Sequence, residues 1–407
     1  MNCRFCNNKV SKQVLDLGES PPSNAYLKDA YLFEKEKYFP LKLFLCEICF
    51  LVQTEDYNLP DELFTEDYAY FSTTSNTFVK HAKNYVDNIT NDLNLDHKSF
   101  VVEIASNDGY LLKNFLDNKI PCLGIEPTKS TYLRSLELKI PSLNEFFNSK
   151  LAEHINTKYK KADLIIANNV YAHVPEINDF TIGIKKILKT NGTVTLEFPH
   201  LLNLIKYNLF DTVYHEHYSY LSLFTVIKIF SKHGLKVYDV EKIKTHGGSL
   251  RIYGCHQNNK KKISENVDLV LNEEKIDGLL EIKSYEKLQI NADKIKLELQ
   301  KFLIEQKKNN KIIVGYGAAA KGNTLLNFCN IKSDMIDFVC DASISKQNQY
   351  LPGSHIKVMH PDMLFKKKID YILILPWNIK DEILKDYSSL KDKGIIFFTA
   401  TNGVKFL

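Results

Sequence analysis

The sequence lacks any long apolar run and any strong excess of one charge. No stretch approaches the ~18 uninterrupted apolar residues of a membrane-spanning helix, and the N-terminus has no apolar core of a secretion signal. The 53 basic and 49 acidic residues give a formal net charge of only +4. Because this balance offers no bulk attraction to nucleic acid or to a membrane surface, we expect a cytoplasmic protein whose partners include neither.

The sequence has few cysteines, but four of them form two closely spaced pairs. Cys3 and Cys6 form one C-x-x-C pair, and Cys46 and Cys49 form the other. The gap between the pairs exceeds the roughly 15–20 residues usual for such sites, and the alternative, a redox C-x-x-C, needs a thioredoxin-like βαβ context that is absent. In a reducing compartment, four thiolates favour a closed, tetrahedral metal site. We expect these four cysteines to bind a structural zinc ion.

A nucleotide-binding turn is present, although the G-x-G-x-x-G pattern of dinucleotide sites is missing. The run 101–104 predicts a buried strand that ends in the small polar turn 105–109, and Glu126 ends the next short strand, where a carboxylate can accept both hydroxyl groups of a ribose. Since little positive charge is available for a pyrophosphate, S-adenosylmethionine fits better. A third strand over 162–167 ends in further polar residues. The residues expected to contact this cofactor are Glu103, Ser106, Asn107, Asp108, Gly109, Glu126, Pro127, Asn168 and Asn169.

The densest polar cluster spans residues 211–220 and contains His215, Glu216 and His217. It favours a general base in a pocket, with tyrosine and glutamate side chains orienting it, because the free pKa of histidine lies near the working pH. Two alternatives stay open. Metal binding lacks the H-E-x-x-H spacing and a third ligand, and both histidines are also compatible with a purely structural role.

Two other stretches are ambiguous. The tyrosines of 67–75 fit a polar substrate pocket and an aromatic connector equally well. Arg251 is equally compatible with binding a substrate oxygen or phosphate and with an ordinary surface ion pair.

Two further segments give clear predictions. A fourth strand over 193–199 is expected to follow a helix that Asn191-Gly192 closes. Residues 257–309 predict solvated helices that link two domains.

A second α/β unit begins at residue 311. A strand runs into 315–320, which is rich in small residues, and then into Lys321 and a helical pattern. Backbone N–H groups at the start of this helix, together with Lys321, predict a phosphate site. The alternative is a tight strand-to-helix turn with a solvated lysine. Runs over 335–341, 371–378 and 394–398 predict further strands of the same sheet.

Taken together, the chain resembles the S-adenosylmethionine-dependent sugar C-methyltransferases, which act on nucleotide-linked 4-keto-deoxysugars. The resemblance covers nearly the whole chain and rests on the two C-x-x-C pairs and on the segments 103–112, 214–220, 247–251 and 315–324. Related sequences often have glycine where Ala105 stands and proline where Ala319 stands. Neither difference removes a functional group.

This resemblance implies an α/β protein of three parts: a zinc-binding region (1–66), a class I methyltransferase domain of the Rossmann-like type (67–256) and, after a helical linker (257–309), a second Rossmann-like domain (310–407). It implies methyl transfer to a ring carbon, expected to be C3, with the substrate held between the outer domains and the cofactor. The residues it assigns to catalysis are His217 as base, with Tyr214, Glu216, His173 and Tyr68. The residues expected to bind substrate are Tyr70, Arg251, Tyr316, Lys321 and Asn323. O- or N-methylation of a sugar and a non-catalytic nucleotide-sugar-binding role are the alternatives.

Overall fold

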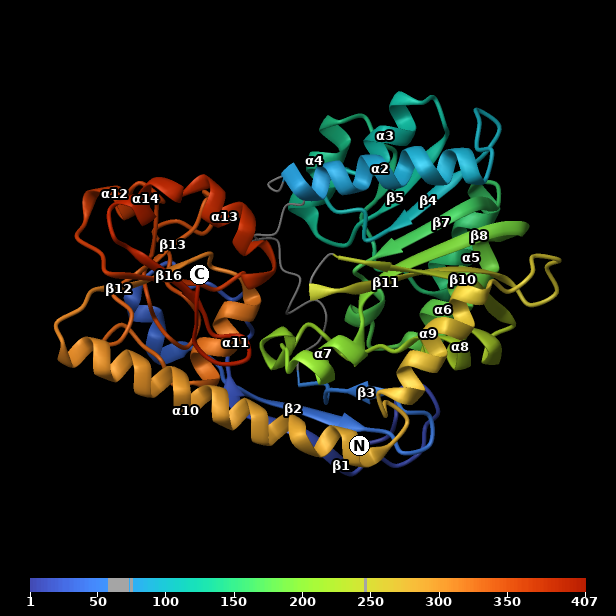
Figure 1. Cartoon of the computed structure of the whole chain (residues 1–407). Coiled ribbons are helices and arrows are strands. Elements are labelled where there is room, and N and C mark those ends of the chain that lie inside the picture. The colour runs from blue at the N-terminus through green and yellow to red at the C-terminus, as the bar shows by residue number, and fades with distance from the viewer. Residues whose placement is uncertain (58–72, 74–75, 245–246) are drawn as a thin grey trace.

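The computed structural model describes residues 1–57, 73, 76–244 and 247–407. Tyr68 and Tyr70 lie outside these residues, so their predicted roles stay predictions. Within the part of the chain that is described, the strands form three sheets (Figure 1). In the same part, no helix combines the length and the apolar character needed to cross a bilayer.

The N-terminal sheet has the strand order β1-β2-β3-β9 and is antiparallel throughout. Its strands are β1 (Lys12–Ser20), β2 (Phe39–Leu45), β3 (Val52–Gln53) and β9 (Ser219–Tyr220), and the short helix η1 (Ala30–Lys35) lies between β1 and β2. β9 comes from the middle of the chain and directly follows His217. The pairing of β3 with β9 therefore ties the predicted catalytic segment to the N-terminal region.

The central sheet has the order β10-β11-β8-β7-β4-β5-β6. The strands from β6 to β8 are parallel, whereas β11 and β10 run antiparallel to their neighbours. This is the class I methyltransferase arrangement that the resemblance implies. In chain order the strands are β4 (Val101–Ile104), β5 (Cys122–Ile125), β6 (Ser142–Leu143), β7 (Ala162–Asn168), β8 (Leu188–Pro199), β10 (Leu235–Ile243) and β11 (Ser249–His256).

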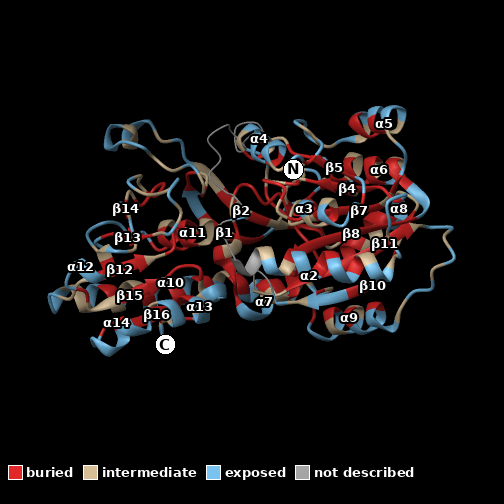
Figure 2. Ribbon diagram, turned by 90° about the horizontal axis from the view of Figure 1, so that it is seen from above, coloured by how far each residue is buried: buried red, intermediate tan, exposed pale blue. Residues whose placement is uncertain are grey.

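Helices cover both faces of the central sheet. Side chains of α2 (Asn76–Asp92) and α3 (Leu112–Asp117) share one apolar core with one face of the sheet, and side chains of α5 (Ser149–Lys158), α6 (Ile177–Ile187) and α8 (Leu223–Lys232) share another with the opposite face. Figure 2 shows the buried strands between these partly exposed helices. The remaining helices of this region are α4 (Lys129–Glu137), η3 (Tyr171–His173), α7 (Leu201–Tyr207) and η4 (Phe210–Thr212).

One predicted boundary is wrong. The structure ends α6 at Ile187 and starts β8 at Leu188, so Asn191 and Gly192 lie inside the strand rather than at a helix end. The register between β7 and β8 shifts at this point, which makes a bulge. Gly192 is needed there because a Cβ atom would lie 2.8 Å from the carbonyl oxygen of Ala162.

The third sheet has the order β14-β13-β12-β15-β16-β17 and is parallel except for β17. This confirms the predicted second Rossmann-like unit. Its strands are β12 (Ile313–Tyr316), β13 (Val339–Cys340), β14 (Val358–Met359), β15 (Tyr371–Ile374), β16 (Ile396–Thr399) and β17 (Lys405–Phe406). Its helices are α11 (Ala320–Phe328), α12 (Met363–Lys366), η7 (Trp377–Ile379), α13 (Lys380–Asp386) and α14 (Ser388–Asp392).

The segment between the two α/β units is helical, as predicted. It contains α9 (Glu265–Ile276), η6 (Ile282–Tyr285) and α10 (Glu286–Lys308). α10 packs its apolar residues into a core shared by β1 and the C-terminal sheet, and Figure 1 shows it running along both. This long helix therefore fixes the C-terminal sheet relative to the N-terminal one.

Candidate active site and cysteine cluster

The four predicted zinc ligands come together. The Sγ atoms of Cys3, Cys6, Cys46 and Cys49 all lie within 4.8 Å of one another, and the Cys3–Cys49 and Cys6–Cys46 distances are both 3.5 Å. Four sulfur atoms bound at the usual Zn–S distance of ~2.3 Å would lie about 3.8 Å apart in a tetrahedron. The cluster therefore fits a zinc ion closed on all four sides. It would supply folding stability rather than catalysis.

The two cysteine pairs are held by matching backbone turns. In the first, the N–H of Asn7 donates to the carbonyl oxygen of Cys3, and in the second the N–H of Phe50 donates to that of Cys46. Both Asn7 and Phe50 have a φ of 61°. β1 and β2 fill the long gap between the pairs, which explains why the spacing in the sequence exceeds the usual one.

The predicted cofactor turn lies at the carboxyl end of β4. Ala105, Asn107 and Gly109 all have positive φ, of 57°, 49° and 81°, so the backbone folds tightly after the strand. Glu126, after β5, accepts hydrogen bonds from the backbone N–H of Asn107 at 2.8 Å and of Thr128 at 2.9 Å. The carboxylate is thus fixed beside the turn, where the second strand of such a sheet presents its ribose ligand.

Several buried oxygen atoms around this turn have no hydrogen-bond partner among the described residues. They belong to Glu103, Ser106, Asp108 and Asn168. Such orphaned acceptors are costly unless a ligand supplies donors, and the hydroxyl, amine and ammonium groups of S-adenosylmethionine are donors. Burial, with the charges of Glu126 and Asp108 nearby, raises the pKa of Glu103 well above its usual value. A site with several carboxyl groups and with oxygen atoms that lack hydrogen-bond donors fits the cationic cofactor.

Two further predicted cofactor residues lie near the same edge. The backbone carbonyl of Pro127 accepts a hydrogen bond from Asn144 Nδ2 at 2.8 Å. Asn169, with a φ of 53°, donates its backbone N–H to the carbonyl oxygen of Glu197 at 2.7 Å. Both contacts shape the backbone at the carboxyl ends of β5 and β7.

His217 lies against two of the residues that the resemblance assigns to the site. Its ring centroid is 4.5 Å from that of His173, with an interplanar angle of 74°, and 4.0 Å from that of Tyr214. His173 follows β7, the strand next to β4, so this pair reaches the edge where the cofactor turn lies. Burial lowers the pKa of His173 to about 4, although a hydrogen bond to the Glu216 backbone opposes the shift.

The other members of the cluster point elsewhere. His215 Nε2 lies 3.2 Å from the carbonyl oxygen of Phe39, and burial lowers the pKa of its ring, which indicates a structural role. The carboxylate of Glu216 faces Asn24 of the N-terminal region, whose Nδ2 donates to both carboxylate oxygens at 3.0 and 2.8 Å. Burial raises the pKa of Glu216 to about 7. Asn24 was not predicted as a site residue, because it is one polar residue among many in a turn-rich loop.

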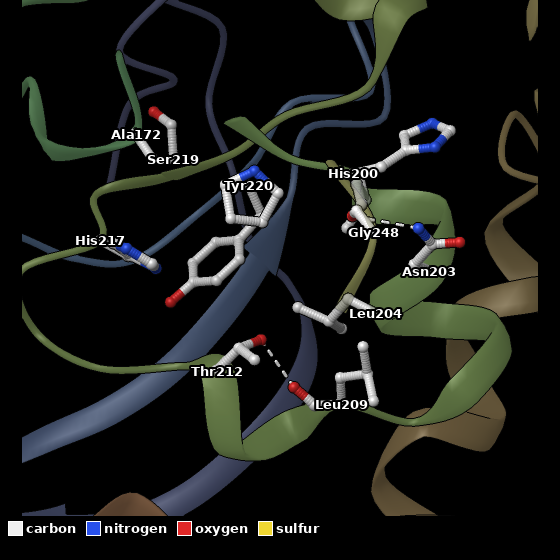
Figure 3. Close-up of a pocket in the computed structure, with 12 residues that line it drawn as sticks. Ala172, His200, Asn203, Leu204, Leu209, Thr212, His217, Ser219, Tyr220 and Gly248 are labelled. Atoms are coloured by element: carbon white, nitrogen blue, oxygen red, sulfur yellow. Dashed lines mark hydrogen bonds between the residues drawn. The ribbon is translucent and has the colours of Figure 1, made fainter. Parts of the chain in front are cut away.

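A narrow pocket opens beside His217. Figure 3 shows His217 on one side, Asn203 on the other and the ring of Tyr220 between them. Asn203 Nδ2 donates to the backbone carbonyl of Gly248 at 3.1 Å, which holds the glycine turn before β11 against α7. Leu201, Leu204 and Leu209 contribute apolar side chains to the lining, and Thr212 and Ser219 contribute hydroxyl groups.

Arg251 does not lie in this pocket. It is buried, and its guanidinium donates Nε to Glu197 at 2.7 Å and Nη1 to Glu241 at 3.0 Å. Both partners stand opposite it on the neighbouring strands β8 and β10. Of the two interpretations of Arg251, the structure shows the ion pair, although the pair is buried rather than at the surface.

The predicted substrate residues of the C-terminal unit lie on or beside α11. Lys321 Nζ donates to Asn378 Oδ1 at 2.7 Å, and burial lowers its pKa to about 8. Asn323 Nδ2 donates to the backbone carbonyl of Ser23 at 2.7 Å, so α11 also contacts the N-terminal loop. Tyr316 donates its hydroxyl to Tyr387 at 3.0 Å.

Known proteins agree with this arrangement. Three family models match successive parts of the chain: "Putative zinc binding domain" over residues 3–64, "Methyltransferase domain" over 78–240 and "C-methyltransferase C-terminal domain" over 244–401. C-methyltransferase NovU of Streptomyces niveus is 29% identical over 392 residues, which cover 96% of this chain and 93% of NovU. The three models and NovU together support an S-adenosylmethionine-dependent C-methyltransferase.

Two solved structures are similar to less than half of this C-methyltransferase. Magnesium protoporphyrin IX methyltransferase of Synechocystis PCC 6803 is 13% identical, with a TM-score of 0.36 over 44% of this chain and 83% of that protein. An S-adenosylmethionine-dependent methyltransferase of Anabaena variabilis is 13% identical, with a TM-score of 0.33 over 43% and 84% of the two chains.

Proposed function

We propose that this C-methyltransferase methylates a ring carbon, expected to be C3, of a nucleotide-linked 4-keto-deoxysugar, and that His217 removes the proton from that carbon. The observation that carries the proposal is the contact of His217 with His173. Through His173, which follows β7, the imidazole reaches the carboxyl edge of the sheet beside the cofactor turn of β4. A base at this edge can face a methyl donor bound to that turn.

The residues supply a consistent acid–base scheme. A ketone acidifies the hydrogen on the neighbouring carbon, so an imidazole can remove it if the enolate oxygen receives a hydrogen bond. In this scheme the proton moves to a ring nitrogen of His217, and the hydroxyl of Tyr214, whose ring lies against His217, is placed to stabilise the enolate oxygen. S-adenosylmethionine, when bound, supplies the electrophilic methyl group. No metal takes part in this scheme, and the cysteine cluster lies elsewhere.

The ring that lies against His217 carries no positive charge in this scheme. His173 stays neutral at physiological pH because burial depresses its pKa to about 4. A neutral neighbour does not repel the positive charge that develops on His217.

The nucleotide part of the substrate is assigned to the C-terminal unit. Lys321 and Asn323 lie on the first turns of α11, and Tyr316 ends the strand before them. A cationic side chain beside a helix N-terminus suits a diphosphate. Arg251 is left out of this proposal, because two carboxylates already neutralise it.

The test is a mass-spectrometric screen of nucleotide-linked 4-keto-deoxysugars with methyl-labelled S-adenosylmethionine. The expected product carries the label on a ring carbon and has lost one deuterium from a substrate deuterated next to the ketone. Label on an oxygen or nitrogen atom with the deuterium retained would indicate O- or N-methylation instead. No labelled product from any keto-sugar would refute the proposed substrate class.

A further inference from the structure

The carboxylate of Glu216 depends on one residue of the N-terminal loop. Asn24 Nδ2 donates to both of its oxygens, at 3.0 and 2.8 Å, and no other hydrogen bond reaches them from the described residues. Glu216 is 2% exposed. A buried carboxylate without a donor is strongly unfavourable, so the amide of Asn24 determines where this side chain can lie. The reverse orientation of the amide would turn its oxygen toward the carboxylate, which the network excludes.

The charged and titratable groups facing Glu216 come from both outer parts of the protein. Tyr26 belongs to the same loop as Asn24, and Lys346 comes from the C-terminal unit; both donate to the carbonyl oxygen of Ala318, at 2.5 and 2.7 Å. The positive charge of Lys346 and the hydrogen bonds from Asn24 lower the pKa of Glu216, but burial outweighs them. Glu216 is therefore the buried acid at the junction of the three parts.

The backbone on either side of Glu216 is also anchored. Thr54 donates its hydroxyl to the carbonyl oxygen of His217 at 3.2 Å, and Thr324 donates its hydroxyl to that of Val213 at 2.8 Å. The ring of His173 bonds to the backbone of Glu216. Because residues 213–217 form a turn without regular strand or helix pairing, these contacts help to hold the backbone that carries His217.

We infer that Asn24 is a positioning residue for the proposed base: by holding the Glu216 carboxylate, it fixes the turn that presents His217 to His173 and the pocket. The N-terminal loop thereby completes the active site from a distant part of the sequence. The loop itself is held in place, since Asn323 Nδ2 donates to the carbonyl oxygen of Ser23 and the hydroxyls of Ser23 and Thr324 lie 3.3 Å apart. This inference rests on the proposed role of His217.

The experiment compares Asn24→Ala and Asn24→Asp with Asn156→Ala. The last is the matched control, because it removes another asparagine amide, which donates to the backbone carbonyl of Lys186 at 2.9 Å between α5 and α6, without touching Glu216 or the N-terminal loop. We expect Asn24→Ala to lower kcat about 10- to 100-fold with KM and cofactor affinity within about threefold, and Asn156→Ala to stay within about twofold of wild type. Asn24→Asp places a second carboxylate next to that of Glu216. The kcat of this variant should therefore be lower than that of the wild type at about pH 8.5. The difference should become smaller as the pH falls to about 6, because the two carboxylates then share a proton and regain a hydrogen bond.

A second measurement needs no substrate. In ¹⁵N-histidine NMR spectra, with the His217 signals assigned by their loss in His217→Asn, Asn24→Ala should shift the signals of His217 and His173, and Asn156→Ala should not. If the wild-type protein methylates no keto-sugar, the proposed function fails and these spectra alone decide the role of Asn24. If Asn24→Ala does not fold, the spectra of Asn24→Asp at low and high pH replace it. Unshifted signals, or wild-type kcat in a folded Asn24→Ala protein, would overturn the inference.

Discussion

The ring of His173 meets the ring of His217 edge-on, with 4.5 Å between their centroids. The two residues lie on separate segments, one after strand β7 and one in the turn before β9. Their contact brings the proposed base to the edge of the sheet where the cofactor turn lies. The neighbouring His215 makes a different contact, with the backbone carbonyl of Phe39.

Replacing His217 by Asn should lower kcat by about 10³-fold, because general bases typically contribute 10²- to 10⁴-fold. Cofactor binding should stay unchanged, since the rings that lie against His217 among the described residues are those of His173, Tyr214 and Tyr220, none of which belongs to the turn at 105–109. Steady-state kinetics and calorimetry with S-adenosylmethionine would measure the two effects. His215→Asn is the matched control. That ring contacts the backbone of Phe39 and should affect stability more than turnover. Full activity in His217→Asn would remove His217 as the base.

Replacing Glu216 by Gln should change how stability depends on pH. Burial raises the pKa of this carboxyl from its usual value near ~4.5 to about 7, so between these pH values the folded protein holds a proton that the unfolded chain has released. The wild-type free energy of unfolding should therefore fall as pH rises through this window, by up to about 3 kcal/mol. Glu216→Gln should lack this contribution, which denaturant unfolding at several pH values would show. Identical pH profiles of the two proteins would contradict the assignment.

Removal of the metal should lower the activity indirectly, through the N-terminal sheet. Elemental analysis should find one zinc ion per chain, and Cys46→Ser should reduce this content and the melting temperature. Because β3 follows the second cysteine pair and is bonded to β9, directly after His217, kcat should fall as well. Cys255→Ser, which alters an isolated buried cysteine, is the control and should keep its zinc. A zinc-free protein with wild-type melting and turnover would exclude a structural role for the ion.

Much of this architecture could be predicted because it depends on local sequence patterns. Apolar runs gave β4, β7 and the strands of the C-terminal sheet, and the repeated C-x-x-C spacing gave the cysteine cluster. Both kinds of signal depend on residues a few positions apart. The approach of His173 to His217 came from the resemblance rather than from any local pattern.

The remaining features depend on which distant segments meet. Asn24 forms its hydrogen bonds with Glu216, 192 positions away, so no sequence pattern near Asn24 indicates its role. Arg251 was ambiguous for the same reason: only the register of β8, β10 and β11 places Glu197 and Glu241 opposite it. Asn191-Gly192 resembled a helix end, yet the need for a close backbone approach at Ala162 put the glycine in a strand bulge. Tertiary contacts override local preference in each case.

The last prediction concerns Ala105, where related sequences often have glycine. Its φ of 57° lies in the left-handed region, which costs a non-glycine residue roughly 1–2 kcal/mol. Ala105→Gly should remove this strain, but glycine gains about 0.4–1 kcal/mol of conformational entropy in the unfolded chain. We therefore expect a net stabilisation of about 0.5 kcal/mol, measured by denaturant unfolding. The matched control is Ala319→Gly in the equivalent turn of the C-terminal sheet, where φ is −98° and no strain is relieved. That variant should be destabilised. If both substitutions lowered stability equally, Ala105 would not be strained, and its backbone would fit the cofactor turn as well as glycine does.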